Sequence, residues 1–510
     1  MLYRNVPRLS LVAVAGLGLA LGLSCAPEYR PCLLGGTCGK TGSSSSLFAG
    51  ETGETFTEVL LQQSTFVEGR VVTTRTHRVD DITHSPVLID FNGDGKVDPV
   101  IGYYQGNLGV VQILLSYGDV GTTQYASLTL DGGDNSWAQL LNLAVGDIDG
   151  DGSLDIVAAT RDGVVYLHHP SDPEHTHVLS EWGQSSGDLE LIESTDERIT
   201  DDELTAILAQ AIGPAANLDN YIVTVQQGYT SLELADFDSD GFNDIAASRS
   251  FRVDLEPKPD VPVEPILIIA GSIQMLINPG GATDGVGWTA TAIGQHERHT
   301  TLDREGARDL RASDVDGDGD LDLISTAADD QNAQVAWFEN PGGPGTIDPL
   351  MPWTQHRIGS VRGAFAVDVA DLTGDGRVDV VATSPTQKQL VMFVQPDEVS
   401  ERGFDWYTVP IVQFESFEPR SVVALDVDND DTLELVLGGT NGAVRYFESP
   451  ANPIDEWSGE IIVTFDPSGD VGLLGYGDLD GDGDTDLVAV VDTGDGTSDR
   501  LTWIRNELIP

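Results

Sequence analysis

Short apolar runs alternate with polar, glycine-rich stretches along most of the chain, and they do so in a repeated order. One unit begins with an apolar segment at 365–370, continues through an acidic loop, and resumes with an apolar segment at 379–382. The preceding unit shows the next two segments: 335–338, rich in β-branched and aromatic residues, and 353–358. Short strands separated by turn residues at even intervals predict an all-β protein.

This order recurs seven times. The starts of the acidic loops are separated by 57, 89, 78, 57, 55 and 52 residues, and the loops begin at Asp90, Asp147, Asp236, Asp314, Asp371, Asp426 and Asp478. We number the loops one to seven in chain order. Four strands in each of seven units predict a seven-bladed β-propeller of four-stranded blades.

The two ends of the chain predict how the ring closes. The last unit ends after its third strand, whereas residues 76–79 near the front resemble the fourth-strand residues 355–358. We therefore expect the N-terminal strand to complete the last blade, which would leave no open sheet edge.

The two longest intervals contain predicted insertions, near 171–228 and 252–265. In the first, Thr200 and Glu203 form a capping box before an apolar stripe that ends at Ala211, and this predicts one short helix. The second contains the proline-rich stretch 256–262, which predicts an extended surface excursion.

The acidic loop has the composition of a site for a hard divalent cation. Its pattern, D-x-[DNT]-x-D-G-x-x-D, offers side-chain oxygens at positions 1, 3, 5 and 9 and a backbone carbonyl at position 7, while calcium binds six to eight oxygen atoms. Glycine at position 6 permits a positive φ. With the carbonyl residue fourth in each set, the predicted ligands are Asp90, Asn92, Asp94, Lys96 and Asp98; Asp147, Asp149, Asp151, Ser153 and Asp155; Asp236, Asp238, Asp240, Phe242 and Asp244; Asp314, Asp316, Asp318, Asp320 and Asp322; Asp371, Thr373, Asp375, Arg377 and Asp379; Asp426, Asp428, Asp430, Thr432 and Glu434; and Asp478, Asp480, Asp482, Asp484 and Asp486.

Two loops depart from the pattern. Asp431 stands where the sixth loop should have glycine, and Thr373 replaces a carboxylate in the fifth. We expect weaker metal binding at both. A single loop of this kind is also consistent with a turn satisfied by its own hydrogen bonds, but seven matched copies favour calcium.

The net charge narrows the choice of partners. The chain has 83 acidic and 26 basic residues and a formal net charge of −57. A nucleic-acid partner is disfavoured, because binding to phosphates needs lysine and arginine. Cations held in the loops would offset part of the repulsion between the carboxylates.

The region from about residue 71 to 510 resembles the FG-GAP/VCBS repeat family, the propeller type also found at the head of integrin α subunits. The stretches 146–152 and 477–483, each G-D-x-D-G-D-G, carry the resemblance. It implies a β-propeller with Ca²⁺, up to seven ions, between the first and second strands of its blades. It also implies an extracellular protein engaged in binding or adhesion.

The N-terminus predicts export. Arg4 and Arg8 precede an apolar run at 11–23 that is too short to span a bilayer, so residues 1–24 are predicted to be a signal peptide. The run ends at Cys25 and resembles a bacterial lipoprotein signal, which implies lipidation of Cys25 and a surface or outer-membrane lipoprotein; simple secretion is the alternative. Lipid on Cys25 would leave Cys32 and Cys38 to pair. A flexible tether is expected at 25–55 and the propeller at 56–510.

No catalytic residues are identified. The G-x-S-x-G match at 183–187 lacks the strand-to-helix context of a nucleophile elbow. We interpret His168, His169, His175 and His177 as strand or surface residues, although such a cluster can bind a transition metal. Trp337, Trp353, Trp406 and Trp503 are expected to pack between blades.

These observations favour a monomeric, exported, calcium-binding propeller that serves as a surface binding or adhesion module for a protein or carbohydrate partner. One alternative is a calcium-dependent polysaccharide lyase or hydrolase on a propeller scaffold. Another is a structural component of the cell envelope. Fold alone does not decide among the three.

Overall fold

The computed structural model describes most of the repeat region between residues 48 and 506. Its main gaps are 57–61, 118–123, 132–136, 170–189, 192–219, 281–287, 298–303, 328–333, 343–352, 398–405 and 493–498, with shorter gaps elsewhere. Residues 1–47 and 507–510 lie outside it, so the predicted signal peptide and all three cysteines are outside the described residues. The predicted helix at 200–211 and the G-x-S-x-G match at 183–187 are also outside them.

The described residues form an all-β fold of successive antiparallel sheets, as the apolar pattern predicted. Six sheets contain consecutive strands, and we number the sheets in the order of their loops. Their members are β5 (Val87–Ile89), β6 (Asp98–Gln105), β7 (Leu108–Tyr117) and β8 (Gln124–Asp131), with β9 (Trp137–Ala138) beside β7; β10 (Leu140–Gly146), β11 (Asp155–Thr160), β12 (Val164–Leu167) and β13 (Glu190–Leu191); β14 (Tyr221–Ala235), β15 (Asp244–Pro257), β16 (Ile266–Ile277) and β17 (Thr289–Gly294); β20 (Ala307–Ser313), β21 (Asp322–Ala327), β22 (Gln334–Glu339) and β23 (Thr354–Ser360); β24 (Val367–Ala370), β25 (Asp379–Ser384), β26 (Gln389–Val394) and β27 (Tyr407–Gln413); and β28 (Pro419–Leu425), β29 (Glu434–Gly439), β30 (Ala443–Glu448) and β31 (Ser458–Thr464).

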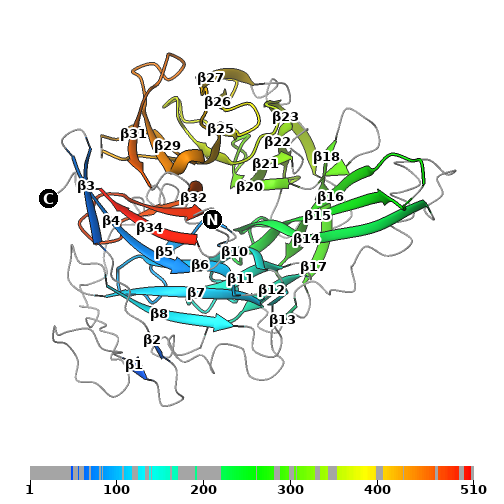
Figure 1. Ribbon diagram of the computed structural model, residues 1–510, viewed down its shortest axis with the longest axis horizontal. Helices are drawn as coiled ribbons and strands as arrows, with labels where there is room; N and C mark the ends of the chain where they lie inside the picture. Colours follow the sequence, from blue (N-terminus) through cyan, green and yellow to red (C-terminus); the bar gives the residue numbers. More distant parts are fainter. Residues whose placement is uncertain are drawn as a thin grey trace.

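The seventh sheet joins the two ends of the described chain. It contains β32 (Asp470–Gly477), β33 (Asp486–Asp492), β34 (Asp499–Arg505), β4 (Arg70–Val79) and β3 (Gln62–Val67), with β4 hydrogen-bonded to β34. Figure 1 shows this junction as a blue strand beside a red one. The predicted pairing of residues 76–79 with the last unit is confirmed: Thr76 lies opposite Thr502 and Val79 opposite Asp499. The fifth strand, β3, was not predicted.

Hydrophobic clusters connect each sheet to the next. Among the described residues, the first and second sheets share one cluster, the second and third another, and this continues through the sixth and seventh. A further cluster packs Leu88 and Ile101 of the first sheet against Leu479, Val488 and Trp503 at the seventh. The sheets follow one another around the molecule in chain order (Figure 1). Trp337, Trp353, Trp406 and Trp503 are all buried, so the packing role expected for them is confirmed.

The third sheet corrects the interpretation of the two insertions. Strands β14 and β15 pair from Ala235 opposite Asp244 to Tyr221 opposite Pro257, with one register shift between Tyr229 and Ser231. The stretches 221–228 and 252–257, predicted as parts of separate insertions, are therefore the two sides of one long hairpin, which projects beyond the other sheets in Figure 1. Strand pairing between segments this far apart is a tertiary interaction that local sequence does not encode.

The remaining described elements are two short strand pairs and one helical turn. Strands β1 (Phe48–Ala49) and β2 (Thr55–Phe56) pair across the end of the predicted tether, and β18 (His296–Glu297) pairs with β19 (Arg304–Glu305). A 3-10 turn, η7 (Thr440–Gly442), lies between β29 and β30. In the part of the chain that the structure describes, no helix is long and apolar enough to cross a membrane.

His296 makes the interior sensitive to acid. Its ring is buried between Ser325 Oγ, 2.7 Å from Nε2, and Gln334 Oε1, 3.1 Å from Nδ1, and burial lowers its pKa from 6.5 to about 4. The folded state therefore prefers the neutral ring. The stability that depends on this group is complete above pH 6.5 and is lost as the pH falls towards 4.

We expect the acid sensitivity to decrease in His296→Gln. Protonation of the wild-type ring should cost on the order of 3 kcal/mol by pH 4, whereas glutamine does not titrate. The measurement is urea unfolding of both proteins at pH 7 and pH 4.5. The difference in stability between them should shift in favour of the variant at the lower pH, and an unchanged difference would contradict the assignment.

Candidate metal centres

Each acidic loop joins the first two strands of its sheet. Position 1 directly follows the first strand, and position 9 is the first residue of the second strand in all seven cases. The acid at position 9 is buried in all seven loops, whereas the aspartate at position 1 is only partly buried. The strands thus hold seven similar acidic turns at equivalent places in the fold.

Backbone amides organise each turn around the aspartate at position 1. One of its carboxylate oxygens accepts the N–H of residue 6, as in Gly95 to Asp90 (2.8 Å) and Gly241 to Asp236 (2.9 Å). The same bond forms in the other five loops, from Gly152, Gly319, Gly376, Asp431 and Gly483. The side chains at positions 3 and 5 similarly accept N–H groups two residues further on, for example Asp149 from Asp151 and Asp151 from Ser153.

In the second, third and fourth loops these bonds use one oxygen of each carboxylate at positions 3 and 5, so the loop amides do not occupy the other oxygen. In the second, third, fourth and sixth loops, three carboxylates offer oxygen atoms that all lie within 4.8 Å of one another. The sets are Asp147, Asp149 and Asp151; Asp236, Asp238 and Asp244; Asp314, Asp316 and Asp322; and Asp426, Asp428 and Glu434. Such clusters of carboxylate oxygens fit a hard cation such as Ca²⁺. Coordination by the predicted carbonyls at position 7 stays a prediction.

Two positions in the loop need a left-handed backbone. The predicted positive φ at position 6 is confirmed, from 86° at Gly95 to 99° at Gly319. Position 4 also has a positive φ in the six loops where the structure describes it. Five of these have glycine there, a signal that the sequence analysis missed, and Ser239 takes the position in the third loop, with φ 58°. Asp431 adopts φ 68° in the sixth loop, so that loop keeps the shape of the others with a strained residue.

We expect Asp431→Gly to raise the free energy of unfolding by about 1 kcal/mol, because glycine has no Cβ to oppose a positive φ. Asp431→Ala removes the same charge but keeps a Cβ, so it should not be stabilised. Urea unfolding of the three proteins in a chelator measures the effect without a metal contribution. Equal stability of the glycine and alanine variants would show that charge, and not backbone strain, is responsible.

The acid at position 9 has a structural role in addition to its predicted role as a ligand. Asp98, Asp155, Asp244, Asp322, Asp379 and Asp486 are fully or almost fully buried. In each, one oxygen accepts the N–H of residue 2 of the loop and the other accepts the N–H of a residue at or just beyond the end of the third strand. Glu434 keeps the first of these bonds, from Val427. These acids therefore tie the loop to the rest of its sheet.

Burial also changes the protonation of these acids. It raises the pKa of Asp98, Asp322 and Asp486 to about 8, that of Asp244 and Glu434 to about 7, and that of Asp379 to about 6. Hydrogen bonds from the backbone oppose these shifts without cancelling them. A buried carboxylate of this kind is stabilised by a bound proton or by a nearby cation.

The residue after the third strand was missed by the sequence analysis. Asn278 donates its side-chain N–H to Ile148 O (2.7 Å) of the second loop and to Asn243 O (3.1 Å) of the third. Asn340 links the third loop, at Phe237 O, to the fourth, at Leu321 O. Asn506 links the sixth and seventh loops in the same way. A polar residue directly before proline is the sequence signal for Asn278 and Asn340. Gln395 also precedes a proline, and its side chain donates to Val315 O of the fourth loop.

Replacing such a linker should lower the free energy of unfolding more than replacing an exposed asparagine. Asn340→Ala removes two buried hydrogen bonds, at 2.8 and 3.0 Å, and leaves two carbonyls without that donor, so we expect a loss of about 2–3 kcal/mol. Asn452→Ala, at an exposed position, should change stability by about 0.5 kcal/mol or less. Equal losses in urea unfolding would contradict a linking role for Asn340.

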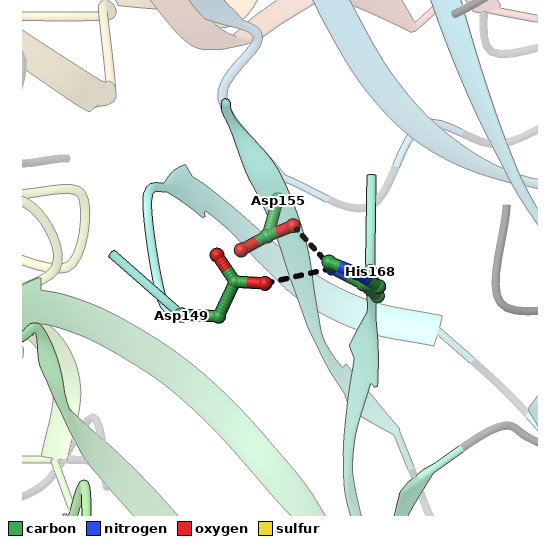
Figure 2. A group of neighbouring side chains, drawn as sticks. All are labelled: Asp149, Asp155 and His168. Carbon is green, nitrogen blue, oxygen red and sulfur yellow. Dashed lines mark hydrogen bonds and ion pairs between the residues drawn. The ribbon is translucent and has the colours of Figure 1, made fainter. Parts of the chain in front are cut away.

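The second loop has a histidine nitrogen beside its carboxylates. Figure 2 shows His168, at the end of β12, pointing towards the loop, with Nδ1 3.2 Å from Asp149 Oδ2 and 3.4 Å from Asp155 Oδ1. The hydrogen bond with Asp155 raises the pKa of His168. His168 is therefore part of the acidic site. The interpretation of His168 as a strand or surface residue is corrected by these contacts. His169 instead lies beside Phe91, and His175 and His177 are outside the described residues.

An arginine contacts the carboxylates of the fifth loop and another those of the seventh. In the fifth, Arg377 donates to Asp375 of its own loop and to Asp397 outside it, while the amide of Thr373 donates to Asp379 (2.9 Å). In the seventh, Arg505 pairs with both Asp480 and Asp482. The seven loops therefore share a backbone shape but differ in which basic side chain, if any, contacts their carboxylates.

Comparison with known proteins supports the repeat assignment for part of the chain. Residues 81–158 and 314–382 match the FG-GAP-like repeat family. No curated protein matches the chain. Among solved structures, the Dos1 propeller is similar, with a TM-score of 0.37 and 10% sequence identity over 87% of this chain and 88% of that one. Similarity at that TM-score is too low to decide the architecture.

Proposed function

We propose that the chain is an exported, calcium-stabilised, closed seven-bladed β-propeller that acts as a surface binding module for a protein or carbohydrate. The main support for this proposal is that one loop geometry is repeated. In it a buried acid at position 9 anchors the turn, and the other carboxylates lie close together. The FG-GAP-like repeats at 81–158 and 314–382 are consistent with this proposal.

Closure of the ring is supported by packing and pairing. The cluster between the first and seventh sheets has the same character as the clusters between consecutive sheets. The N–H of Ile82, between β4 and β5, also donates to Asp499 of β34 at 2.7 Å. A closed ring would give every sheet two neighbours and would hold the loops in a rigid arrangement, so binding would depend on calcium through the stability of that scaffold.

The binding module is tested by calcium-dependent capture of a partner. The purified protein is applied to a glycan array and to an array of purified surface proteins, in calcium and in EDTA. We expect binding to at least one class in calcium, its loss in EDTA and its recovery when calcium is restored. Capture that is identical in calcium and in EDTA would contradict a calcium-supported binding surface.

We also propose that the chain is exported and anchored through lipid on Cys25. The proposal rests on Arg4, Arg8 and the apolar run at 11–23. Incorporation of radiolabelled palmitate by the wild-type protein, and its loss in Cys25→Ala with continued export, is the expected result. Export of a wild-type protein without label would favour simple secretion.

A further inference from the structure

An arginine side chain lies against the carboxylates of the seventh loop. Arg505 is the last residue of β34, and its Nε lies 2.6 Å from Asp480 Oδ2 while Nη2 lies 3.0 Å from Asp482 Oδ2. The two carboxylates are almost completely buried, with 0% and 8% of their side chains exposed, and 22% of the arginine side chain is exposed. The guanidinium thus contacts positions 3 and 5 of the loop together.

We propose that Arg505 is the resident cation of the seventh loop and keeps that loop from binding calcium. The inference rests on the proposed calcium binding by the other loops. The other oxygen of Asp480 and of Asp482 already accepts a loop amide, so the oxygens that contact Arg505 are those that a metal ion would use. The guanidinium donates a charge-assisted hydrogen bond to Asp482 and forms an ion pair with Asp480, and calcium would have to displace it.

The second sheet has His168 at the corresponding place, with Nδ1 near Asp149 and Asp155, but the first, third, fourth and fifth sheets have no basic residue there. The residue that precedes the partner of the position-9 acid is Leu115 in the first sheet, Ile277 in the third and Val394 in the fifth. In the fourth sheet it is Glu339. Arg377 of the fifth loop differs from Arg505, because it shares its guanidinium between one loop carboxylate and Asp397 outside the loop.

Arg505 also lies at the junction between the two ends of the described chain. Thr73 of β4 lies opposite Arg505 in the pairing that joins the front of the described chain to its last sheet. A built-in cation therefore stabilises the loop of the sheet in which the two ends meet. That sheet should remain intact when calcium is removed, while the loops that depend on metal loosen.

Counting bound ions tests the proposal directly. Native mass spectrometry in calcium compares the wild-type protein with Arg505→Gln, and we expect the variant to bind one additional ion. Arg500→Gln is the matched control: it lies on the same strand and removes the same charge, and no ion should be gained. Equal counts for the wild type and Arg505→Gln, with ions bound to both, would overturn the inference and leave calcium binding by the other loops standing. Absence of ions from both proteins would overturn the calcium proposal and this inference with it.

Hydrogen exchange of the wild-type protein provides a test that needs no variant. In calcium compared with EDTA, peptides covering the second, third and fourth loops should become protected, whereas the peptide covering 478–486 should exchange at the same rate in both. Protection of 478–486 by calcium equal to that of the other loops would show that Arg505 is displaced and would overturn the proposal.

Discussion

Removal of calcium should lower the melting temperature of this protein by on the order of 10 °C. Each ion that binds the folded state alone stabilises it by about 2.7 kcal/mol when its free concentration is one hundred times its dissociation constant. Four loops bring three carboxylates within 4.8 Å of one another, so several such contributions are lost together. The same carboxylates then repel one another in a chain whose formal net charge is −57.

The measurement is differential scanning calorimetry in EDTA and across a calcium titration. Magnesium is the control, because it requires shorter and more regular octahedral coordination and should restore less stability. Asp236→Asn, at position 1 of the third loop, should reduce the calcium-dependent increase without abolishing it. If the melting temperature is the same in EDTA and in calcium, the acidic loops are turns satisfied by their own hydrogen bonds and the calcium proposal fails.

Arg311→Met should destabilise the protein by about 3–5 kcal/mol, the cost of removing one partner from a buried ionic group. Arg311 is buried in β20, with Nη1 2.5 Å from Asp309 Oδ1 and Nε 3.5 Å from Asp368 Oδ1. Burial by itself would lower the pKa of Arg311, but the carboxylates of Asp309, Asp368 and Glu233 raise it. The guanidinium therefore stays charged, and its removal leaves three acids without their counter-charge.

These acids also connect neighbouring sheets. Ala312 of the fourth sheet donates its N–H to Glu233 of the third (3.2 Å), Val367 of the fifth donates to Asp309 of the fourth (3.0 Å), and Ala424 of the sixth donates to Asp368 of the fifth (2.9 Å). Loss of the arginine should therefore weaken several junctions between sheets. A drop in the cooperativity of unfolding is expected together with the loss of stability.

Arg308→Met is the matched control, since it removes the same charge from the same strand. Arg308 is half-buried and lies over the ring of Phe365 at 4.6 Å, so its loss should cost about 1 kcal/mol or less. Urea unfolding of both variants in saturating calcium separates the two effects. A cost for Arg311→Met no greater than that for Arg308→Met would mean that the buried arginine does not hold the acids together.

The acidic loops were predictable because their geometry is local. The spacing of aspartate and glycine within nine residues places position 1 at the end of a strand and position 9 at the start of the next, and the positive φ of Gly95 and its equivalents follows from glycine itself. The burial of the tryptophans followed from their places in apolar strands. The positive φ at position 4 could have been predicted in the same way, from the glycine that five loops have there.

Contacts made between sheets were not predictable from single loops. Asn278 connects carbonyls of two loops that are far apart in sequence, and Arg505 reaches Asp480 and Asp482 from the end of a different strand. His168 approaches Asp149 and Asp155 for the same reason. Sequence pattern identifies these residues only as polar positions at strand ends, because their partners are chosen by strand pairing.

The sequence by itself determined the all-β class, the number and place of the acidic loops, and the pairing of residues 76–79 with the last unit, because each of these depends on periodicity, turn chemistry or a repeated motif. The tertiary structure decided which charges face each loop, how Arg311 is surrounded by acids, and that 221–228 and 252–257 form one hairpin. The physical reason is that burial and charge pairing depend on which strands become neighbours. Seven loops of nearly one sequence thereby acquire different surroundings, with His168 beside the second and Arg505 beside the seventh.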